Sequence, residues 1–177
     1  MSTPSALSKP TIAFHWIVAI AIIGMLAFGL YLEDLPRSPE KGELMGLHKS
    51  FGVVVLMLAS LRIVWRVKEG PIPAIGDASG WQEKMAKGIH HLLLLATVLM
   101  PVSGIMMSVG GGRGLDVFGI NLIAAGEKIE WLGQLGGATH GVLAKIMIAA
   151  ILLHVLGAIK HHVLMKDNTL TRMLGKS

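Results

Sequence analysis

Cysteine is absent from the 177 residues of this chain. Without thiol sulfur, the chain cannot form disulfides, thiolate zinc sites, iron–sulfur clusters or the covalent attachment of a c-type haem. Charge is also scarce, because 15% of the residues are charged and 53% are hydrophobic, whereas soluble domains average roughly 25% charged residues. A bilayer excludes charge, so this deficit, together with a mean hydropathy of +0.63, indicates an integral membrane protein.

Four long apolar runs separate the few charged segments. A helix needs about 20 largely apolar residues to cross the hydrocarbon core, and the apolar–polar alternation that a membrane barrel requires is absent. The sequence therefore predicts an all-α integral membrane fold, a bundle of four transmembrane helices that forms a single membrane domain over residues 1–177. The expected spans are residues 12–32, 47–65, 89–109 and 142–164. The first run is too long for a secretory signal, and no small-residue cleavage site follows it.

The loops between the runs alternate in charge. Acidic side chains outnumber basic ones in the first and third loops, whereas the second loop and the tail are basic. Because Lys and Arg favour the cytoplasmic side of a membrane, we expect both termini in the cytoplasm. The net charge of +5 reflects basic residues at the ends of apolar runs, which favours a membrane surface over nucleic acid as the partner.

Two connectors carry turn signals. Residues 70–73 read Gly-Pro-Ile-Pro, and residues 110–114 read Gly-Gly-Gly-Arg-Gly. The second stretch lacks the Gly-Lys-Ser/Thr ending of a phosphate-binding loop and has no preceding strand, so it is predicted to be a flexible connector.

Histidines recur at or inside every span, where an ionisable residue indicates function by default. His140 and His154 are 14 residues apart, so both point to nearly one helix face, roughly 21 Å apart along the axis. In the expected topology, His15 lies at the inner depth of His154, and His48 lies at the outer depth of His140. A lone histidine in a span is more often a packed or interfacial residue, but four at matched depths favour two imidazole pairs.

Two bis-imidazole pairs stacked across a membrane are typical of two b haems. A haem held by two histidines has no open axial position, which suits electron transfer rather than oxygen binding. His161 is seven residues past His154 and shares its face, so it is an alternative inner ligand. His154 is preferred because residues 148–159 around it carry no charge, whereas His161 follows Lys160 at the membrane edge.

Short motifs extend over nearly the whole chain and are specific in combination. They are His15-Trp16, Pro36-Arg37-Ser38, His48, Leu61-Arg62, Arg66, His90, Pro101-Val102-Ser103-Gly104, His140, His154, His161-His162 and the segment 166–173. With these motifs the chain resembles the bacterial cytochrome b-561 family, which is related to the cytochrome b subunits of nickel hydrogenases and formate dehydrogenases.

The resemblance implies a four-helix bundle in the bacterial inner membrane that encloses two b haems, with His15, His48, His140 and His154 as axial ligands. Close relatives are implied to oxidise superoxide outside and to pass electrons to ubiquinone, so we predict an oxidoreductase of this type. The alternative is a membrane cytochrome b subunit that passes electrons between a partner dehydrogenase or hydrogenase and quinone. The expected partners are membrane lipid, ubiquinone and superoxide, with an electron-transfer protein under the alternative and no nucleic acid.

Further residues are candidates for the two substrate sites. We expect ubiquinone near the inner haem, where His161, His90 and Arg62 are available to bind a carbonyl, exchange protons or hold a propionate. Arg62 is equally explained by snorkelling to the surface. Arg37 is the first candidate for attracting superoxide, and the weaker ones are Lys41, Arg113, Lys128 and Lys145. The glycine-rich third loop and Lys145 depart from the family pattern, which leaves the outer donor site less defined than the haem sites.

Overall fold

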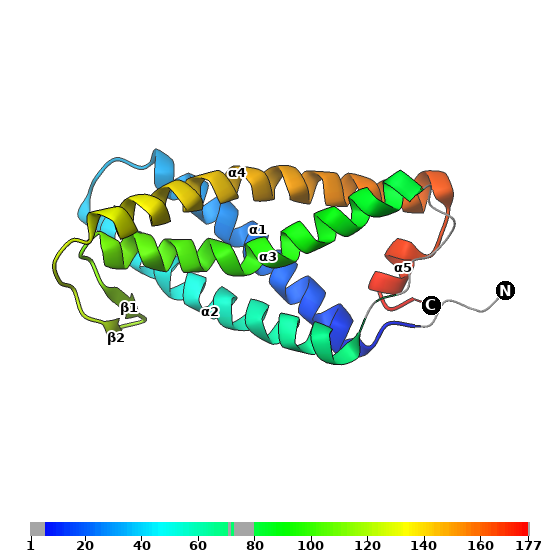
Figure 1. The fold of residues 1–177 in the computed structure, drawn as a ribbon, viewed down its shortest axis with the longest axis horizontal. Coiled ribbons are helices and arrows are strands. Elements are labelled where there is room, and N and C mark those ends of the chain that lie inside the picture. The colour runs from blue at the N-terminus through cyan, green and yellow to red at the C-terminus, as the bar shows by residue number, and fades with distance from the viewer. Residues whose placement is uncertain (1–5, 71, 73–79, 177) are drawn as a thin grey trace.

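The computed structural model describes residues 6–70, 72 and 80–176. Four long helices run the length of the molecule, and they are α1 (Lys9–Asp34), α2 (Pro39–Glu69), α3 (Gly80–Gly110) and α4 (Glu130–Lys160) (Figure 1). Each is long and apolar enough to cross a membrane, which confirms the predicted four-helix membrane fold. Every predicted span lies within one of these helices, except that the fourth continues into η1 (His161–Met165), a π-helical turn.

Local sequence signals explain where the first two helices begin and end. The side chains of Ser8 and Ser38 cap α1 and α2 by accepting hydrogen bonds from the backbone N–H groups of Thr11 and Lys41. A proline follows each cap within the first two helical positions. Gly70 ends α2 with a φ of 83°, a conformation that glycine adopts without strain. The remainder of the predicted Gly-Pro-Ile-Pro turn falls largely outside the described residues.

The bundle buries small residues and exposes large apolar ones. Its core cluster consists of Val18, Ile22, Val55, Ala96 and Met147. Most of the buried polar residues are small hydroxyls, such as Ser103, whose proton bonds a nearby carbonyl, and Arg172 near the C-terminus is buried as well. Large aliphatic side chains on all four helices are exposed. This arrangement fits a protein whose surroundings are lipid, where packing of small residues holds helices together.

Helices α3 and α4 approach each other most closely. A Cβ atom added at Gly136 of α4 would lie 2.5 Å from the backbone nitrogen of Met107 in α3, so only glycine fits there. Helix α3 bends along its length (Figure 1), and Pro101 accounts for a bend because it cannot donate the helical hydrogen bond to the carbonyl of Thr97.

A two-stranded antiparallel hairpin joins α3 to α4. Strand β1 (Leu115–Val117) pairs with β2 (Ile120–Ile123), and Val117 lies opposite Ile120 beside the turn. The prediction of a flexible connector here was wrong. The glycine-rich stretch is an ordered turn, in which backbone bonds tie Arg113 to Ser108 and Gly126 to Gly112.

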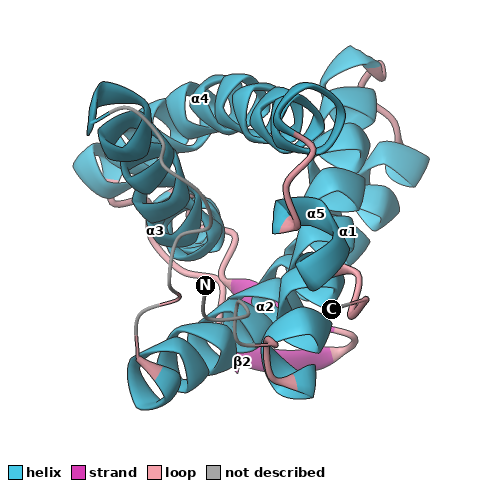
Figure 2. Cartoon of the chain, turned by 90° about the vertical axis from the view of Figure 1, so that its right-hand side faces the viewer, coloured by secondary structure: helices cyan, strands magenta, loops and turns pink. Residues whose placement is uncertain are grey.

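The two ends of the bundle differ in what covers them. The end that carries β1 and β2 is called the hairpin end. At the opposite end, the short helix α5 (Thr169–Met173) turns back beside α1 (Figure 2). The indole N–H of Trp16 in α1 donates to the carbonyl of Met173, at 2.8 Å. This end is called the α5 end.

Candidate functional site

The structure brings the four predicted ligand histidines together as two pairs. The ring centroids of His15 in α1 and His154 in α4 are 6.1 Å apart. Those of His48 in α2 and His140 in α4 are 6.4 Å apart. The first pair lies toward the α5 end and the second toward the hairpin end, and α4 supplies one ring to each.

The spacing within each pair suits one metal ion held between two imidazoles. Nitrogen ligands lie about 2 Å from a bound transition metal, so imidazoles on opposite sides of it have ring centroids roughly 6 Å apart. In the described part of the chain, no group of three or more His, Asp or Glu side chains is placed to hold a metal. Each pair can therefore supply two ligands only, which fits the axial positions of a haem whose macrocycle supplies the rest.

The hairpin-end pair has a neutral, close-fitting surround. His140 places Nδ1 3.0 Å from the carbonyl of Met100 and 3.2 Å from Oγ of Ser103, so Nδ1 carries the proton and Nε2 is free to bind iron. A Cβ atom added at Gly104 would lie 3.2 Å from Cε1 of His140, and one added at Gly29 would lie 3.3 Å from Cε1 of His48. These two glycines make room for the rings.

The α5-end pair is surrounded by further ionisable groups. A guanidinium nitrogen of Arg62 lies 3.4 Å from Nδ1 of His15. The ring of His90 in α3 lies 5.2 Å, centroid to centroid, from that of His154. Two of the residues predicted for quinone or propionate binding, Arg62 and His90, thus lie directly beside this pair.

His161 has a partner that the sequence analysis missed. Its Nδ1 lies 2.5 Å from a carboxylate oxygen of Asp167, just beyond η1, and the other carboxylate oxygen accepts the backbone N–H of Thr169. Burial raises the pKa of Asp167, but the bonds from His161 and Thr169 together hold that pKa below its ordinary value. The spacing of six residues gave no helical signal, because Lys166 reverses the chain with a φ of 51°.

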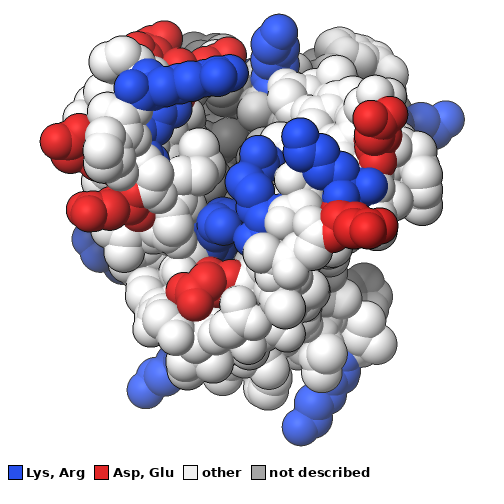
Figure 3. All heavy atoms as spheres, turned by 90° about the vertical axis from the view of Figure 1, so that its left-hand side faces the viewer, with Lys and Arg blue, Asp and Glu red and all other residues white. Residues whose placement is uncertain are grey.

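Basic side chains gather around a hollow at the hairpin end, with acidic ones nearby (Figure 3). Arg37 is exposed in the loop before α2. The ammonium group of Lys41 donates to the carbonyl of Leu35 and so caps the end of α1. Arg113 and Lys128 are exposed in the third loop. Lys145 is exposed five residues past His140, which turns it about 140° away from that ring.

Lys49 is a second residue that the sequence analysis missed. It follows His48 directly, and its ammonium nitrogen lies 3.5 Å from Oγ of Ser108 in α3. A lysine next to a ligand histidine in the sequence was the available signal, but only the packing of α2 on α3 shows that it faces inward.

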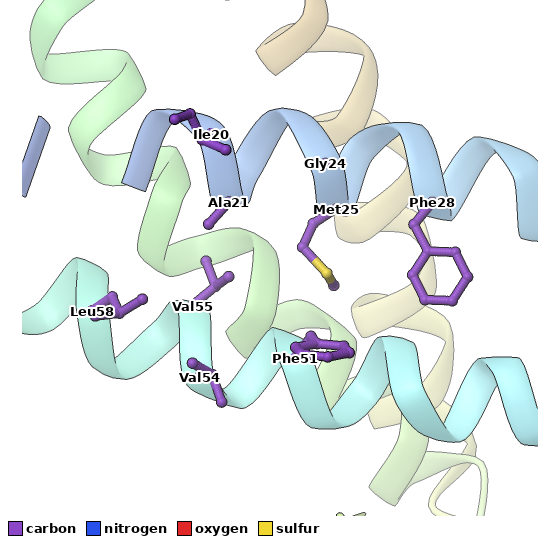
Figure 4. Close-up of a pocket in the computed structure, with 9 residues that line it drawn as sticks. All are labelled: Ile20, Ala21, Gly24, Met25, Phe28, Phe51, Val54, Val55 and Leu58. Atoms are coloured by element: carbon purple, nitrogen blue, oxygen red, sulfur yellow. The ribbon is translucent and has the colours of Figure 1, made fainter. Parts of the chain in front are cut away.

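An apolar pocket separates the levels of the two pairs on the α1–α2 side. It measures about 250 Å³, and its lining consists of Ile20, Ala21, Gly24, Met25, Phe28, Phe51, Val54, Val55 and Leu58 (Figure 4). None of these side chains donates or accepts a proton, so the residues that line this pocket cannot relay protons between the two ends of the bundle.

The paired histidines in four apolar helices agree with one known family. The sequence model described as prokaryotic cytochrome b561 matches residues 6–176. The chain belongs to the prokaryotic cytochrome b561 family. Among its relatives, Cytochrome b561 homolog 2 of Escherichia coli (strain K12) is 33% identical over 99% of this chain and 95% of its own length. Probable superoxide oxidase CybB of Yersinia pestis is 29% identical over 93% of each chain. Cytochrome b562 of Cereibacter sphaeroides is 29% identical over 98% of each chain.

Family membership and the four helices establish the broad function. This b561-type cytochrome is a multi-pass bacterial membrane protein of electron transfer, and its family implies haem b as the cofactor. The word superoxide appears in the name of the Yersinia pestis relative and describes that protein.

Proposed function

We propose that this cytochrome holds two b haems and moves electrons across the membrane from superoxide outside to ubiquinone. His15 and His154 would hold one haem at the α5 end, and His48 and His140 would hold the other at the hairpin end. The observation that carries the proposal is the centroid separation in the two ring pairs, 6.1 and 6.4 Å, which matches an iron atom between two imidazoles. When bound, the haems supply one-electron transfer.

The geometry favours His154 over His161 as the inner ligand. The ring of His154 faces that of His15, whereas Nδ1 of His161 bonds Asp167 beyond the end of α4. Because Asp167 holds the Nδ1 proton, Nε2 of His161 accepts a hydrogen bond from a ligand at the bundle end when the ring is neutral and donates one when the ring is protonated.

The ubiquinone site lies at the α5 end. His161 and His90 bind the quinone carbonyls or exchange protons with them, and Arg62 supplies a fixed positive charge beside His15. Two electrons and two protons convert one quinone to one quinol, and protonable groups are concentrated at this end. The Asp167 carboxylate holds the imidazole of His161 in one tautomer, as a carboxylate does for a catalytic histidine elsewhere.

The superoxide site lies at the hairpin end. Each superoxide anion gives up one electron and leaves as dioxygen, so two anions supply the electrons for one quinol. No proton is needed on that side. Arg37, followed by Arg113 and Lys128, provides a positive field that draws the anion toward the His48–His140 pair.

The charges of the loops set the proposed orientation. Lys and Arg concentrate between α2 and α3 and after α4, so both termini and the α5 end face the cytoplasm. Reporter fusions at Gly112 and Ser177 test this topology. A reporter that is active only in the periplasm should work at Gly112 and fail at Ser177, and the reverse pattern would overturn the orientation.

The function is tested by mixing the oxidised holoprotein with superoxide and following the haem absorbance. We expect rapid reduction that added superoxide dismutase abolishes, followed by reoxidation by a ubiquinone analogue with one quinol formed per two superoxide anions. Haem that superoxide does not reduce at any ionic strength, but that quinol does reduce, would overturn the superoxide role. The remaining function would then be that of a membrane cytochrome b subunit that passes electrons between a partner dehydrogenase or hydrogenase and quinone.

A further inference from the structure

The β1–β2 hairpin is fixed to the bundle on one side only. Oγ of Ser50 in α2 accepts the backbone N–H of Phe118 at 3.0 Å, and Oγ of Ser108 in α3 donates to the carbonyl of Gly114 at 2.6 Å. Leu115 is buried beneath the hairpin. Three large apolar side chains of the hairpin, Phe118, Ile120 and Leu122, are nevertheless each more than half exposed, at 52%, 65% and 55%.

The turn of the hairpin holds an aromatic residue where the backbone disfavours one. Phe118 and Gly119 have φ values of 51° and 85° and connect Val117 to Ile120, so they form a two-residue turn of type I′. Asn and Gly are the usual residues in such a turn, and a bulky residue at positive φ is strained. A contact made by the phenylalanine side chain must therefore offset this strain.

The ring of Phe118 packs against a surface that faces lipid. Its centroid lies 5.3 Å from that of Phe51 in α2, in an edge-to-face contact, and Phe51 is itself 47% exposed. Phe51 is three residues past His48 toward the middle of the bundle, which is about 4.5 Å deeper along the helix.

The depth of Phe51 places its contact with Phe118 inside the hydrocarbon. The two histidine levels are roughly 21 Å apart along α4. A hydrocarbon core about 30 Å thick, centred between them, extends roughly 4 to 5 Å beyond each level. Phe51 then lies roughly 9 Å inside the boundary of the core, so the ring of Phe118 that touches it reaches below that boundary.

The composition of the hairpin agrees with this position. Residues 117–126 contain no charged side chain, and charged residues resume at Glu127. Trp131, at the start of α4, is 67% exposed, as interfacial aromatic residues are. The free edge of the hairpin needs water for its backbone groups, so it cannot sink further into lipid.

We propose that the β1–β2 hairpin is an interfacial membrane anchor, in which Phe118, Ile120 and Leu122 contact the acyl chains of the leaflet at the hairpin end. The occupant is lipid because the exposed apolar surface of the hairpin continues that of α2 through the Phe118–Phe51 contact. This anchor fixes the height of the connector between α3 and α4 relative to the bilayer, and the proposal does not depend on superoxide or quinone being the substrate.

The absence of cysteine makes the test direct, because one introduced cysteine carries one spin label. The holoprotein is labelled at Ile120→Cys or Leu122→Cys and reconstituted in phosphatidylcholine vesicles. Collisions of the label with oxygen, which concentrates in lipid, are compared with collisions with a water-soluble nickel chelate. Glu127→Cys in the same connector is the aqueous reference, and Leu61→Cys on the exposed face of α2 is the lipid reference.

Labels at 120 and 122 should resemble the label at 61, with frequent oxygen collisions and few nickel collisions, while the label at 127 shows the reverse. Nickel accessibility at 120 and 122 equal to that at 127 would place the hairpin in water and overturn the proposal. Shielding from both reagents would mean that protein covers the patch, which overturns it as well. An unchanged haem spectrum confirms that each variant is folded, and Leu122→Cys decides alone if Ile120→Cys does not fold.

Discussion

The two histidine pairs of this cytochrome share one helix but have opposite surroundings. The hairpin-end pair is held by a carbonyl, a hydroxyl and two glycines. The α5-end pair lies beside Arg62 and His90, with the His161–Asp167 pair beyond it. Under the proposed function, pairs of similar ring geometry serve two different tasks. A neutral surround suits electron transfer alone, whereas a surround of ionisable groups suits electron transfer coupled to protons.

The largest effect is expected from removing a ligand. His140→Ala and His154→Ala should each lower the haem content to about half of the wild-type value, because each leaves the other two-histidine pair intact. His161→Ala should keep both haems. Haem quantitation per purified protein measures this. Loss of haem in His161→Ala but not in His154→Ala would make His161, and not His154, the ligand at the α5 end.

The next effect concerns proton exchange at the α5 end. Asp167→Asn should slow reoxidation of the haem by a ubiquinone analogue roughly tenfold, because the imidazole of His161 loses its orienting carboxylate. Asp116→Asn, at the exposed hairpin turn, is the matched control and should leave the rate unchanged. Equal rates in the wild type and Asp167→Asn would remove the pair from the quinone site.

The pH dependence of the same step follows from the lowered pKa of Asp167. A carboxyl whose folded-state pKa is depressed stays ionised until the pH falls through that value, below the ordinary range of an aspartate. The slowing caused by Asp167→Asn should therefore be equally large at neutral and mildly acidic pH. A difference that vanishes as soon as the pH reaches the ordinary aspartate range would contradict the assignment.

A smaller effect is expected from surface charge at the hairpin end. Arg37→Glu should slow haem reduction by superoxide about threefold at low salt, and added salt should shrink the difference because it screens the field. Lys176→Glu makes the same charge change at the α5 end and should have no effect. If both variants slow the reaction equally, net charge matters and the position of Arg37 does not.

The smallest effect is expected from removing one hydrogen-bond partner of His140. Ser103→Ala removes one of the two groups that accept the Nδ1 proton of His140, while the Met100 carbonyl stays. A hydrogen bond contributes about 1 kcal/mol, so the potential of the hairpin-end haem should rise by up to roughly 40 mV. Redox titration measures this, and a shift confined to the α5-end haem would contradict the pairing of His140 with the hairpin end.

The sequence predicted features that depend on one segment at a time. Four apolar runs identified the four helices, and helical periodicity placed His140 and His154 on one face. That these histidines bind haem iron stays a prediction. The hairpin was missed because its stability comes from Ser50 and Phe51, more than sixty residues away in the sequence.

Helix α4 begins at Glu130, 12 residues before the expected membrane span of 142–164, and this extension was not predicted. Residues 133–137 are rich in glycine and polar for a membrane helix. They are helical because Gly136 packs against the backbone of α3 at Met107, a contact that no local signal contains. Asp167 was missed for a similar reason, since the reversal at Lys166 brings it back to His161.

Helix α4 carries one histidine of each pair, so it sets the distance between the two pairs. The 14 residues from His140 to His154 fix both the height and the direction of each ring. Inserting one residue between them would turn one ring by about 100° away from its partner. Removing seven would keep the direction but bring the levels roughly 10 Å closer. Substitutions at the positions between the two histidines are therefore tolerated far better than an insertion or deletion there.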